Sequence, residues 1–98
     1  MIDHEVRIAI LRIINDPKTG KAVHAAAQKA MNGTIADQRR FLETGRAAAQ
    51  FEDDKVAVFR ILADPKVEPA VKAAAERALA TNTPEALRYF LERGQYEV

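Results

Sequence analysis

The chain has 98 residues, of which 48% are hydrophobic and 30% charged, and its formal net charge is +1. This balance argues against a disordered chain, and it argues against attraction to nucleic acids or anionic membranes through overall charge. No cysteine, no apolar run of about 18 residues and no N-terminal signal segment occurs, which argues against disulfides, thiolate metal sites and a membrane span.

The first part of the chain predicts two helices. An apolar pattern with helical spacing starts after Asp3, a predicted N-cap, and runs to about Asn15 before a proline interrupts it. An alanine-rich helix is then predicted from about Lys21 to Asn32, with Gly33 as a left-handed stop. Alanine lets neighbouring helices approach closely, so this second helix is expected to lie on the inside.

A third helix is predicted to start at Thr34 and to end at Gly45. Thr34 and Asp37 have the spacing of a capping box, and a glycine is a common stop signal. The alanine-rich stretch 46–51 predicts a further short helix. The acidic run 52–54 then predicts either a break or the acidic first turn of a new helix, and this helix is expected from about Asp54 to Ala63.

The second part of the chain repeats the first. The alanine-rich block 22–31 returns as 70–79, displaced by 48 positions, and the block Phe-Leu-Glu-Thr-Gly at 41–45 returns as Phe-Leu-Glu-Arg-Gly at 90–94, displaced by 49. Pro69 predicts the first position of a helix running to about Thr81. Thr83 and Pro84 predict the start of a last helix that stops at Gly94.

These patterns predict an all-α fold built as a single domain, residues 1–98, from two tandem three-helix repeats at about 3–50 and 51–98. The repeats are expected to stack as a short α-solenoid or a compact helical bundle. The expected core consists of apolar residues that recur between the repeats: Ile13, Ala26, Phe41, Leu42, Ile61, Ala74, Phe90 and Leu91.

The alanine block and the Phe-Leu-Glu-x-Gly block occur twice with nearly the same spacing. In these two blocks and their spacing, the chain resembles the ALF repeat family of short bacterial helical repeats. The resemblance covers nearly the whole chain. It implies a noncatalytic scaffold or adhesion segment of a larger, mostly secreted bacterial protein, such as a toxin assembly, and it supplies no catalytic residue. The run Thr81-Asn82-Thr83 departs from the family's usual Gly-Thr.

The residue types argue against an enzyme. Serine and cysteine are absent, so a hydroxyl nucleophile would have to be one of five threonines, and none has a histidine nearby in the sequence. His4 and His24 correspond to Glu52 and Lys72 of the second repeat, as expected for positions facing solvent. We therefore expect no catalytic residue, no metal site and no cofactor.

Five side chains are candidates for contact with a partner protein: Arg39, Arg40, Arg88, Tyr89 and Tyr96. Arg39 and Arg88 recur between the repeats and could form a ladder of contacts, although pairing with Glu43 and Glu92 in the same helix explains them more simply. Arg40 and Tyr89 occupy the same repeat position with different side chains, as variable binding positions on a constant scaffold would. Tyr96 could instead belong to the edge of the core.

The expected partner is another protein, an adjacent repeat, or a second copy of this chain meeting an exposed repeat edge. The alternative is a nucleic-acid-binding domain of the helix-turn-helix kind, against which the dispersed basic residues argue. The resemblance implies secretion as part of a longer precursor. Because this chain carries no signal peptide, a cytoplasmic location stays open.

Overall fold

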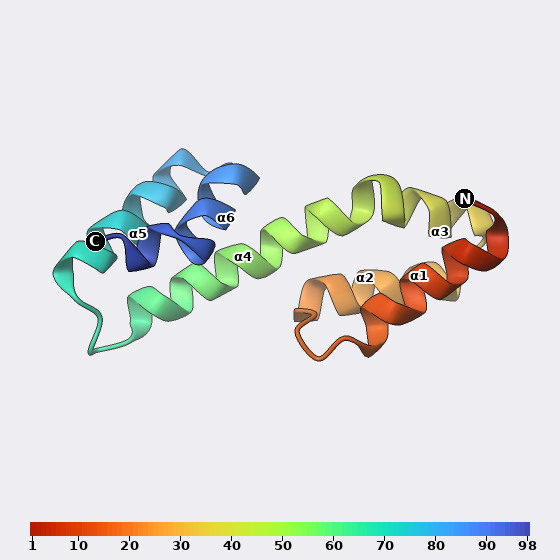
Figure 1. Ribbon diagram of the computed structural model, residues 1–98, viewed down its shortest axis with the longest axis horizontal. Helices are drawn as coiled ribbons and strands as arrows, with labels where there is room; N and C mark the ends of the chain where they lie inside the picture. The colour runs from red at the N-terminus through yellow and green to blue at the C-terminus, as the bar shows by residue number, and fades with distance from the viewer. The chain divides into compact units, whose positions relative to one another are not determined.

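Six α-helices make up most of the protein, and no β-strand occurs, which confirms the all-α prediction (Figure 1). The computed structural model describes residues 1–98. The α-helices are α1 (Asp3–Asn15), α2 (Lys21–Met31), α3 (Ile35–Arg40), α4 (Arg46–Ala63), α5 (Pro69–Thr81) and α6 (Pro84–Glu92). A π-helix, η1 (Phe41–Gly45), lies between α3 and α4, and a 3-10 helix, η2 (Gly94–Tyr96), follows α6.

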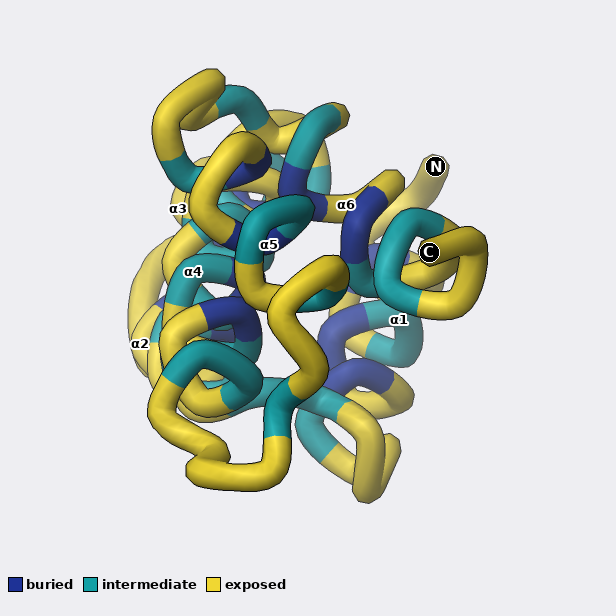
Figure 2. Tube along the Cα trace, turned by 90° about the vertical axis from the view of Figure 1, so that its left-hand side faces the viewer, coloured by how far each residue is buried: buried dark blue, intermediate teal, exposed yellow.

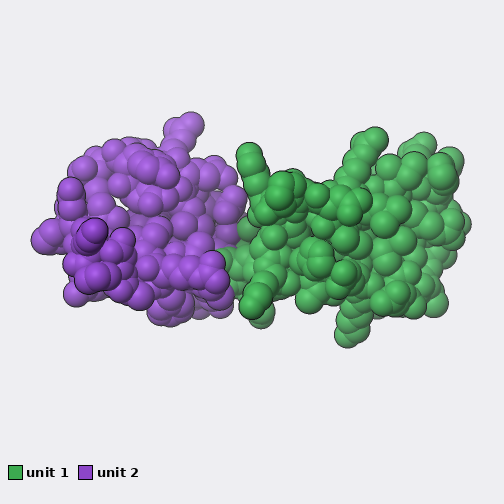
Figure 3. Space-filling model, turned by 90° about the horizontal axis from the view of Figure 1, so that it is seen from below, with its two compact units in different colours: residues 1–53 green, residues 54–98 purple.

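The chain divides into two compact units, shown in different colours in Figure 3. Unit 1 is Met1–Asp53 and unit 2 is Asp54–Val98, so the boundary falls within α4. Unit 1 contains α1, α2, α3, η1 and the first part of α4. Unit 2 contains the rest of α4 together with α5, α6 and η2. Each unit therefore contains one of the two alanine-rich helices and the helix that follows it.

The predicted starts of the helices after the alanine blocks are confirmed. Thr34 and Asp37 form the capping box of α3: the Asp37 N–H donates to the Thr34 hydroxyl at 3.1 Å, and the Thr34 N–H donates to the Asp37 carboxylate at 2.9 Å. In α6, Thr83 is the N-cap and Pro84 the first helical residue, and Pro69 begins α5 in the same way.

The turn between the first two helices of each unit is the same. The Asp16 carboxylate accepts a hydrogen bond from the Lys18 N–H, and the Asp64 carboxylate accepts one from the Lys66 N–H, both at 2.9 Å. A proline separates donor and acceptor in each case, which fixes φ in the turn. The repeated Asp-Pro-Lys sequence therefore has one local conformation in both units.

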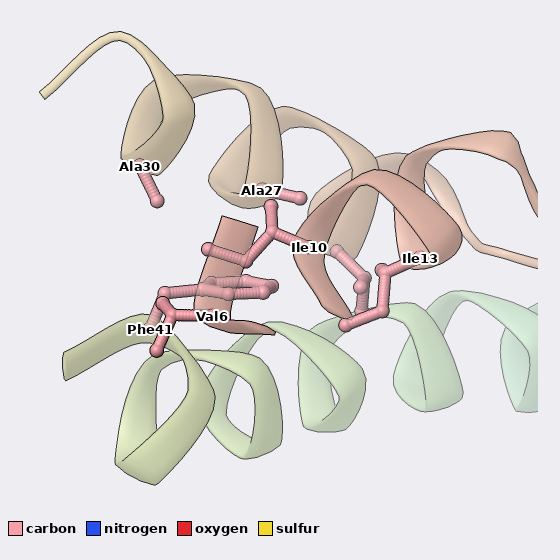
Figure 4. Packing of buried hydrophobic residues seen from close by; sticks show 7 residues of the cluster. Val6, Ile10, Ile13, Ala27, Ala30 and Phe41 are labelled. Carbon is pink, nitrogen blue, oxygen red and sulfur yellow. The ribbon is translucent and has the colours of Figure 1, made fainter. Parts of the chain in front are cut away.

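In unit 1, the core lies between α1, α2 and η1. Figure 4 shows side chains of α1 and α2 gathered between these helices and the following helical segment, with Phe41 at one end of the cluster and Ile13 at the other. The buried residues of this core are Val6, Ile10, Ile13, Val23, Ala27, Ala30 and Phe41. In unit 2, the buried apolar residues are Val58, Ala75, Ala78, Leu87 and Phe90. Along each helix, the tube in Figure 2 alternates between buried and exposed, as expected when one face of the helix packs on a core.

The predicted core is correct for Ile13, Phe41 and Phe90, which are buried. The other predicted core residues, Leu42, Ile61, Leu91, Ala26 and Ala74, are only partly buried. The alanines that pack in the core lie one position further along, at 27 and 75, and again at 30 and 78. One position on a helix corresponds to a rotation of about 100°, so the prediction chose an adjacent face of the alanine helices.

The predicted helix end at Gly45 and the predicted break at 52–54 are both wrong. Residues 35–63 are helical without interruption: α3 passes into the π-helix η1, and η1 passes into α4. A glycine inside a helix costs only about 1 kcal/mol. The residues after it, 46–63, contain neither glycine nor proline, so nothing in that stretch stops helix propagation.

Two smaller expectations about helix ends were also wrong. Gly33 does not have a positive φ; the only residue in the left-handed region is Asn82, with φ of 54°, at the C-cap of α5. Asparagine tolerates this region better than other residues with a side chain. At the start of the chain, the N-cap of α1 is Ile2, and Asp3 is an acidic residue of the first turn.

Candidate functional site

Each unit has a groove between its alanine helix and the helix that follows. In unit 1, this groove lies between α2 and the α3–η1 segment, has a volume of about 610 Å³, and is called groove 1. In unit 2, it lies between α5 and α6, has a volume of about 310 Å³, and is called groove 2. Groove 1 is lined by Ala26, Lys29, Ala30, Asn32, Gly33, Asp37, Arg40, Phe41 and Gly45.

The two grooves are built from corresponding positions of the repeat. Groove 2 is lined by Ala74, Arg77, Ala78, Thr81, Ala86, Tyr89, Phe90, Gly94, Glu97 and Val98. All of these except the last two align with lining residues of groove 1 at the sequence displacements of 48 and 49. The grooves are therefore the same structural feature, formed once in each unit.

The floor of the grooves is apolar and is the same in both units. Ala30 and Phe41 are buried beneath groove 1, as Ala78 and Phe90 are beneath groove 2. The alanine side chain is small and fills little of the space between its helix and the next one, so the groove stays hollow above the aromatic ring. The π-helix contributes here, because Phe41 and Gly45 are its first and last residues, and π-helical segments often occur at functional sites.

The rim of groove 1 carries two cations and one carboxylate. Lys29 and Arg40 are exposed, and the Arg40 side chain is 74% accessible. Arg40 lies 3.9 Å from the Asp37 carboxylate, a long and exposed ion pair that contributes little. Hydrogen bonds from the Thr34 N–H and hydroxyl lower the pKa of Asp37, so this carboxylate is committed to the helix cap. Lys29 and Arg40 therefore remain available to an incoming group.

The rim of groove 2 is already in contact with the chain's own C-terminal residues. The Tyr89 hydroxyl donates to the two carboxylate oxygens of Glu97 at 3.0 and 2.9 Å. This bond to a carboxylate raises the pKa of Tyr89. η2 packs against both α5 and α6, and the Gln95 side-chain amide donates to the Leu91 carbonyl at 2.6 Å. These contacts place Glu97 and Val98 in the wall of groove 2.

The structure thus brings Arg40 and Tyr89 to the rims of the two grooves, at the same repeat position. The other three predicted contact residues lie elsewhere. Tyr96 is 76% exposed and lines neither groove. It is too exposed to belong to the core edge.

Arg39 and Arg88 hold helices together within their own units. Arg39 lies 2.7 Å from the Asp3 carboxylate and also donates to the Met1 carbonyl. Arg88 makes two parallel hydrogen bonds to Asp54, at 2.6 and 2.7 Å, and a third at 3.2 Å to Glu92. The pairing of Arg88 with Glu92 in the same helix is as predicted, whereas Arg39 pairs with α1. Both guanidinium groups are thus engaged within the chain.

The Asp54–Arg88 pair joins a buried carboxylate to a partly exposed guanidinium group. The Asp54 residue is only 2% exposed, while the Arg88 side chain is 45% exposed. The hydrogen bonds to Asp54 are the main reason why the pKa of Arg88 is raised. A buried carboxylate requires such partners, because an unpaired charge is strongly disfavoured away from water. Asp54 therefore fastens α4 to α6.

Asp53, the preceding residue, caps the start of α2. Its carboxylate accepts hydrogen bonds from the Ala22 and Val23 N–H groups, at 2.8 and 3.0 Å. These donors have no partner within the helix, and a negative charge is favourable at that end. The sequence predicted a break or an acidic first turn at Asp53 and Asp54, and neither prediction includes the roles that these residues have. The one indication of the Asp53 role in the sequence was the glycine at position 20. In the structure, a Cβ atom at Gly20 would overlap the Asp53 carboxyl group.

The structure contains no cluster of three or more His, Asp or Glu residues placed to hold a metal ion. His4 is exposed and His24 partly buried, on different helices. None of the helices is long and apolar enough to cross a membrane.

Comparisons with known proteins identify the repeat. The sequence pattern of the ALF family, described as short repeats of unknown function, matches twice, at residues 7–49 and 55–97. The chain matches none of the curated proteins and none of the solved structures. The two matches correspond to the two structural copies and cover most of the 98 residues. The chain therefore belongs to the ALF family of short repeats.

Proposed function

We propose that the protein is a noncatalytic binding module whose grooves hold segments of a partner protein. The observation that carries this proposal is the pair of equivalent grooves. Their floors are identical in type, with alanine and phenylalanine in both, whereas their rims differ, with Arg40 on one and Tyr89 on the other. A constant apolar floor with a variable polar rim suits binding of related segments with different specificity.

The groove size also supports a peptide rather than a folded surface as the ligand. A volume of about 610 Å³ lies within the range of ordinary ligand sites, and it accommodates a few side chains rather than a whole interface. We propose that the module serves as a scaffold within a larger protein. A secreted bacterial toxin assembly or adhesin is the setting that family resemblance suggests. In that setting, each repeat contributes one short contact and the array supplies avidity.

The test is a selection of peptides from a random library on the intact chain, followed by binding to groove variants. Ala26→Leu and Ala74→Leu place a larger side chain in grooves 1 and 2. Ala25→Leu and Ala80→Leu are matched controls on the same two helices, at exposed positions outside the grooves. We expect selected peptides to lose binding to a groove variant and to keep binding to its control.

Two results would contradict the proposal. One is a library that yields no binding peptide at all. The other is a set of peptides whose affinity is unaffected by both groove variants, because binding would then occur elsewhere. Retention of a specific DNA sequence by the intact chain, in place of peptides, would favour the nucleic-acid alternative.

A further inference from the structure

In groove 2, the C-terminal residues Glu97 and Val98 form part of the wall, and their contacts indicate the chemistry that such a groove suits. After Gly94 the chain leaves the helical path, since Arg93 has φ of −136° and ψ of −52° and η2 follows. This turn carries Glu97 to the Tyr89 hydroxyl and Val98 to the groove wall. The contact joins an acidic side chain to a polar rim and an aliphatic side chain to an apolar wall.

Groove 1 has no such segment. Gly45 corresponds to Gly94, but after Gly45 the chain continues as the helix α4. The residues that correspond to the C-terminal segment are therefore helical, and none of them lines groove 1. Groove 1 is the larger of the two, at about 610 Å³ against 310 Å³. The C-terminal residues thus form part of the wall in groove 2, whereas groove 1 lacks that part of the wall.

The rim of groove 1 is better suited to an acidic group than that of groove 2. Arg40 occupies the repeat position of Tyr89, whose hydroxyl donates to Glu97 in groove 2. The Arg40 side chain is exposed. Lys29 stands where groove 2 has Arg77. A guanidinium group makes stronger hydrogen bonds to a carboxylate than a phenol does, because both partners are charged. The Asp37 carboxylate opposes this attraction, but it is hydrogen-bonded to Thr34, and the two cations leave the rim positive overall.

We propose that groove 1 binds an acidic-aliphatic peptide segment of a partner protein: a glutamate held by Arg40 and Lys29, with a following aliphatic residue against Ala26 and Ala30. The proposal rests on the proposed binding function and specifies its ligand. The C-terminal segment of a second copy would fit the chemistry, but in each copy it lies against groove 2 of its own chain. Because an intramolecular contact has a high effective concentration, this segment stays with groove 2 of its own chain. We therefore assign a separate partner protein as the occupant of groove 1.

The experiment is a titration of the ¹⁵N-labelled intact chain with an amidated peptide of sequence Leu-Glu-Arg-Gly-Gln-Tyr-Glu-Val, copied from residues 91–98. We expect chemical-shift changes at the amides of Ala26, Ala30 and Gly45. Replacing the second glutamate of the peptide by glutamine should weaken binding about tenfold, the effect of losing a close charge pair. Binding should also weaken at high salt, because the rim is exposed.

Two matched charge reversals locate the contact. Arg40→Glu should weaken binding about tenfold or more, whereas Arg7→Glu, an exposed arginine of α1 outside the groove, should change it less than about twofold. Arg40→Lys keeps the charge and should retain most of the affinity. Because Arg40 is exposed, these variants are expected to fold, and their circular dichroism spectra verify this.

Three outcomes would overturn the proposal: no shift at any peptide concentration, equal weakening by Arg40→Glu and Arg7→Glu, or shifts confined to Ala74 and Ala78 of groove 2. Failure here is distinguishable from failure of the proposed function. If the library instead yields peptides without a carboxylate that Ala26→Leu blocks, the binding function stands and this ligand assignment is wrong.

Discussion

The two units have the same helices but use different polar contacts to hold them together. Unit 1 has Asp53 at the start of α2 and an exposed pair between Arg39 and Asp3. Unit 2 has the buried pair of Asp54 and Arg88. Asp54 occupies the repeat position of Val6, a buried core residue of unit 1. The arginine position is thus constant, while its acidic partner lies at an exposed site in one unit and in the core of the other.

At a second pair of corresponding positions, the buried polar residue lies in unit 1 and the apolar residue in unit 2. Gln38 of unit 1 is buried, and its Oε1 atom accepts no hydrogen bond. The corresponding residue in unit 2 is Leu87, which is fully buried. The comparison teaches that a helical repeat keeps its apolar frame while each copy places its buried polar groups independently. Four variants, each with its own measurement, test this difference between the units.

The largest effect is expected for Arg88→Ala, which leaves the buried Asp54 without its bidentate partner. We expect unit 2 to lose about 2 to 3 kcal/mol, at or just below the lower end of the range of about 3 to 5 kcal/mol for breaking a buried pair, because Arg88 is itself partly exposed. Native-state hydrogen exchange of α5 and α6 amides measures the loss. The control is Arg39→Ala, whose exposed pair with Asp3 should cost unit 1 less than about 1 kcal/mol. Equal losses would show that the two arginines are equivalent.

Asp53→Ala removes the cap of α2 and should destabilise unit 1 by about 1 to 2 kcal/mol, as loss of a helix cap does. Exchange of the Ala22 and Val23 amides with solvent should become faster. Gly20→Ala places a Cβ atom against the same carboxyl group and should have a similar effect. The double variant should lose little more than either single variant. Additive losses would contradict the shared mechanism.

Gln38→Leu transfers the unit 2 residue into unit 1. It removes a buried acceptor that has no partner, so we expect unit 1 to gain about 1 kcal/mol, near the lower cost of an unsatisfied polar group. Denaturant melts of the intact chain give the change. Leu87→Gln is the reverse exchange and should destabilise unit 2. A loss of stability in Gln38→Leu would indicate that the amide has a compensating role.

The smallest effect concerns the pH dependence of the α3 cap. The pKa of Asp37 is lowered in the folded state by its hydrogen bonds to Thr34. Its contribution to stability is therefore fully present above the ordinary value of 3.8 and is lost as the pH falls through the lower folded pKa. Asp37→Asn should reduce the loss of stability between pH 5 and about pH 2, measured by thermal melts. An unchanged pH profile would show that the cap contributes nothing.

The sequence correctly predicted the helix starts that depend on neighbouring residues. Proline at 69 and 84 and threonine at 34 and 83 act through their immediate neighbours, and each begins or caps a helix as expected. Gly45 was misleading, because a glycine's stop signal is weak and a π-helix accommodates it. The candidate site was predicted only through Arg40 and Tyr89, whose difference at one repeat position was visible in the sequence.

The remaining features depend on tertiary contacts. Asp53 bonds to residues about 30 positions earlier, and Asp54 to one 34 positions later, so no local pattern indicates either role. The groove itself follows from which alanines face the core, and a helix composed largely of alanine has little apolar asymmetry from which to choose that face. The C-terminal segment reaches groove 2 after an irregular residue, Arg93, whose conformation the sequence does not indicate.

The position of these two aspartates determines where the protein can be cut into single repeats. The family matches end at residue 49 and resume at residue 55, so both aspartates fall in the interval between them. A fragment trimmed to 1–49 would lack the carboxylate that caps α2, and a fragment trimmed to 55–98 would leave Arg88 without Asp54. Neither would show the stability that its repeat has in the intact chain. The contacts that stabilise each unit therefore extend beyond the repeat defined by sequence, and a fragment keeps them only if it includes residue 53 on one side or residue 54 on the other.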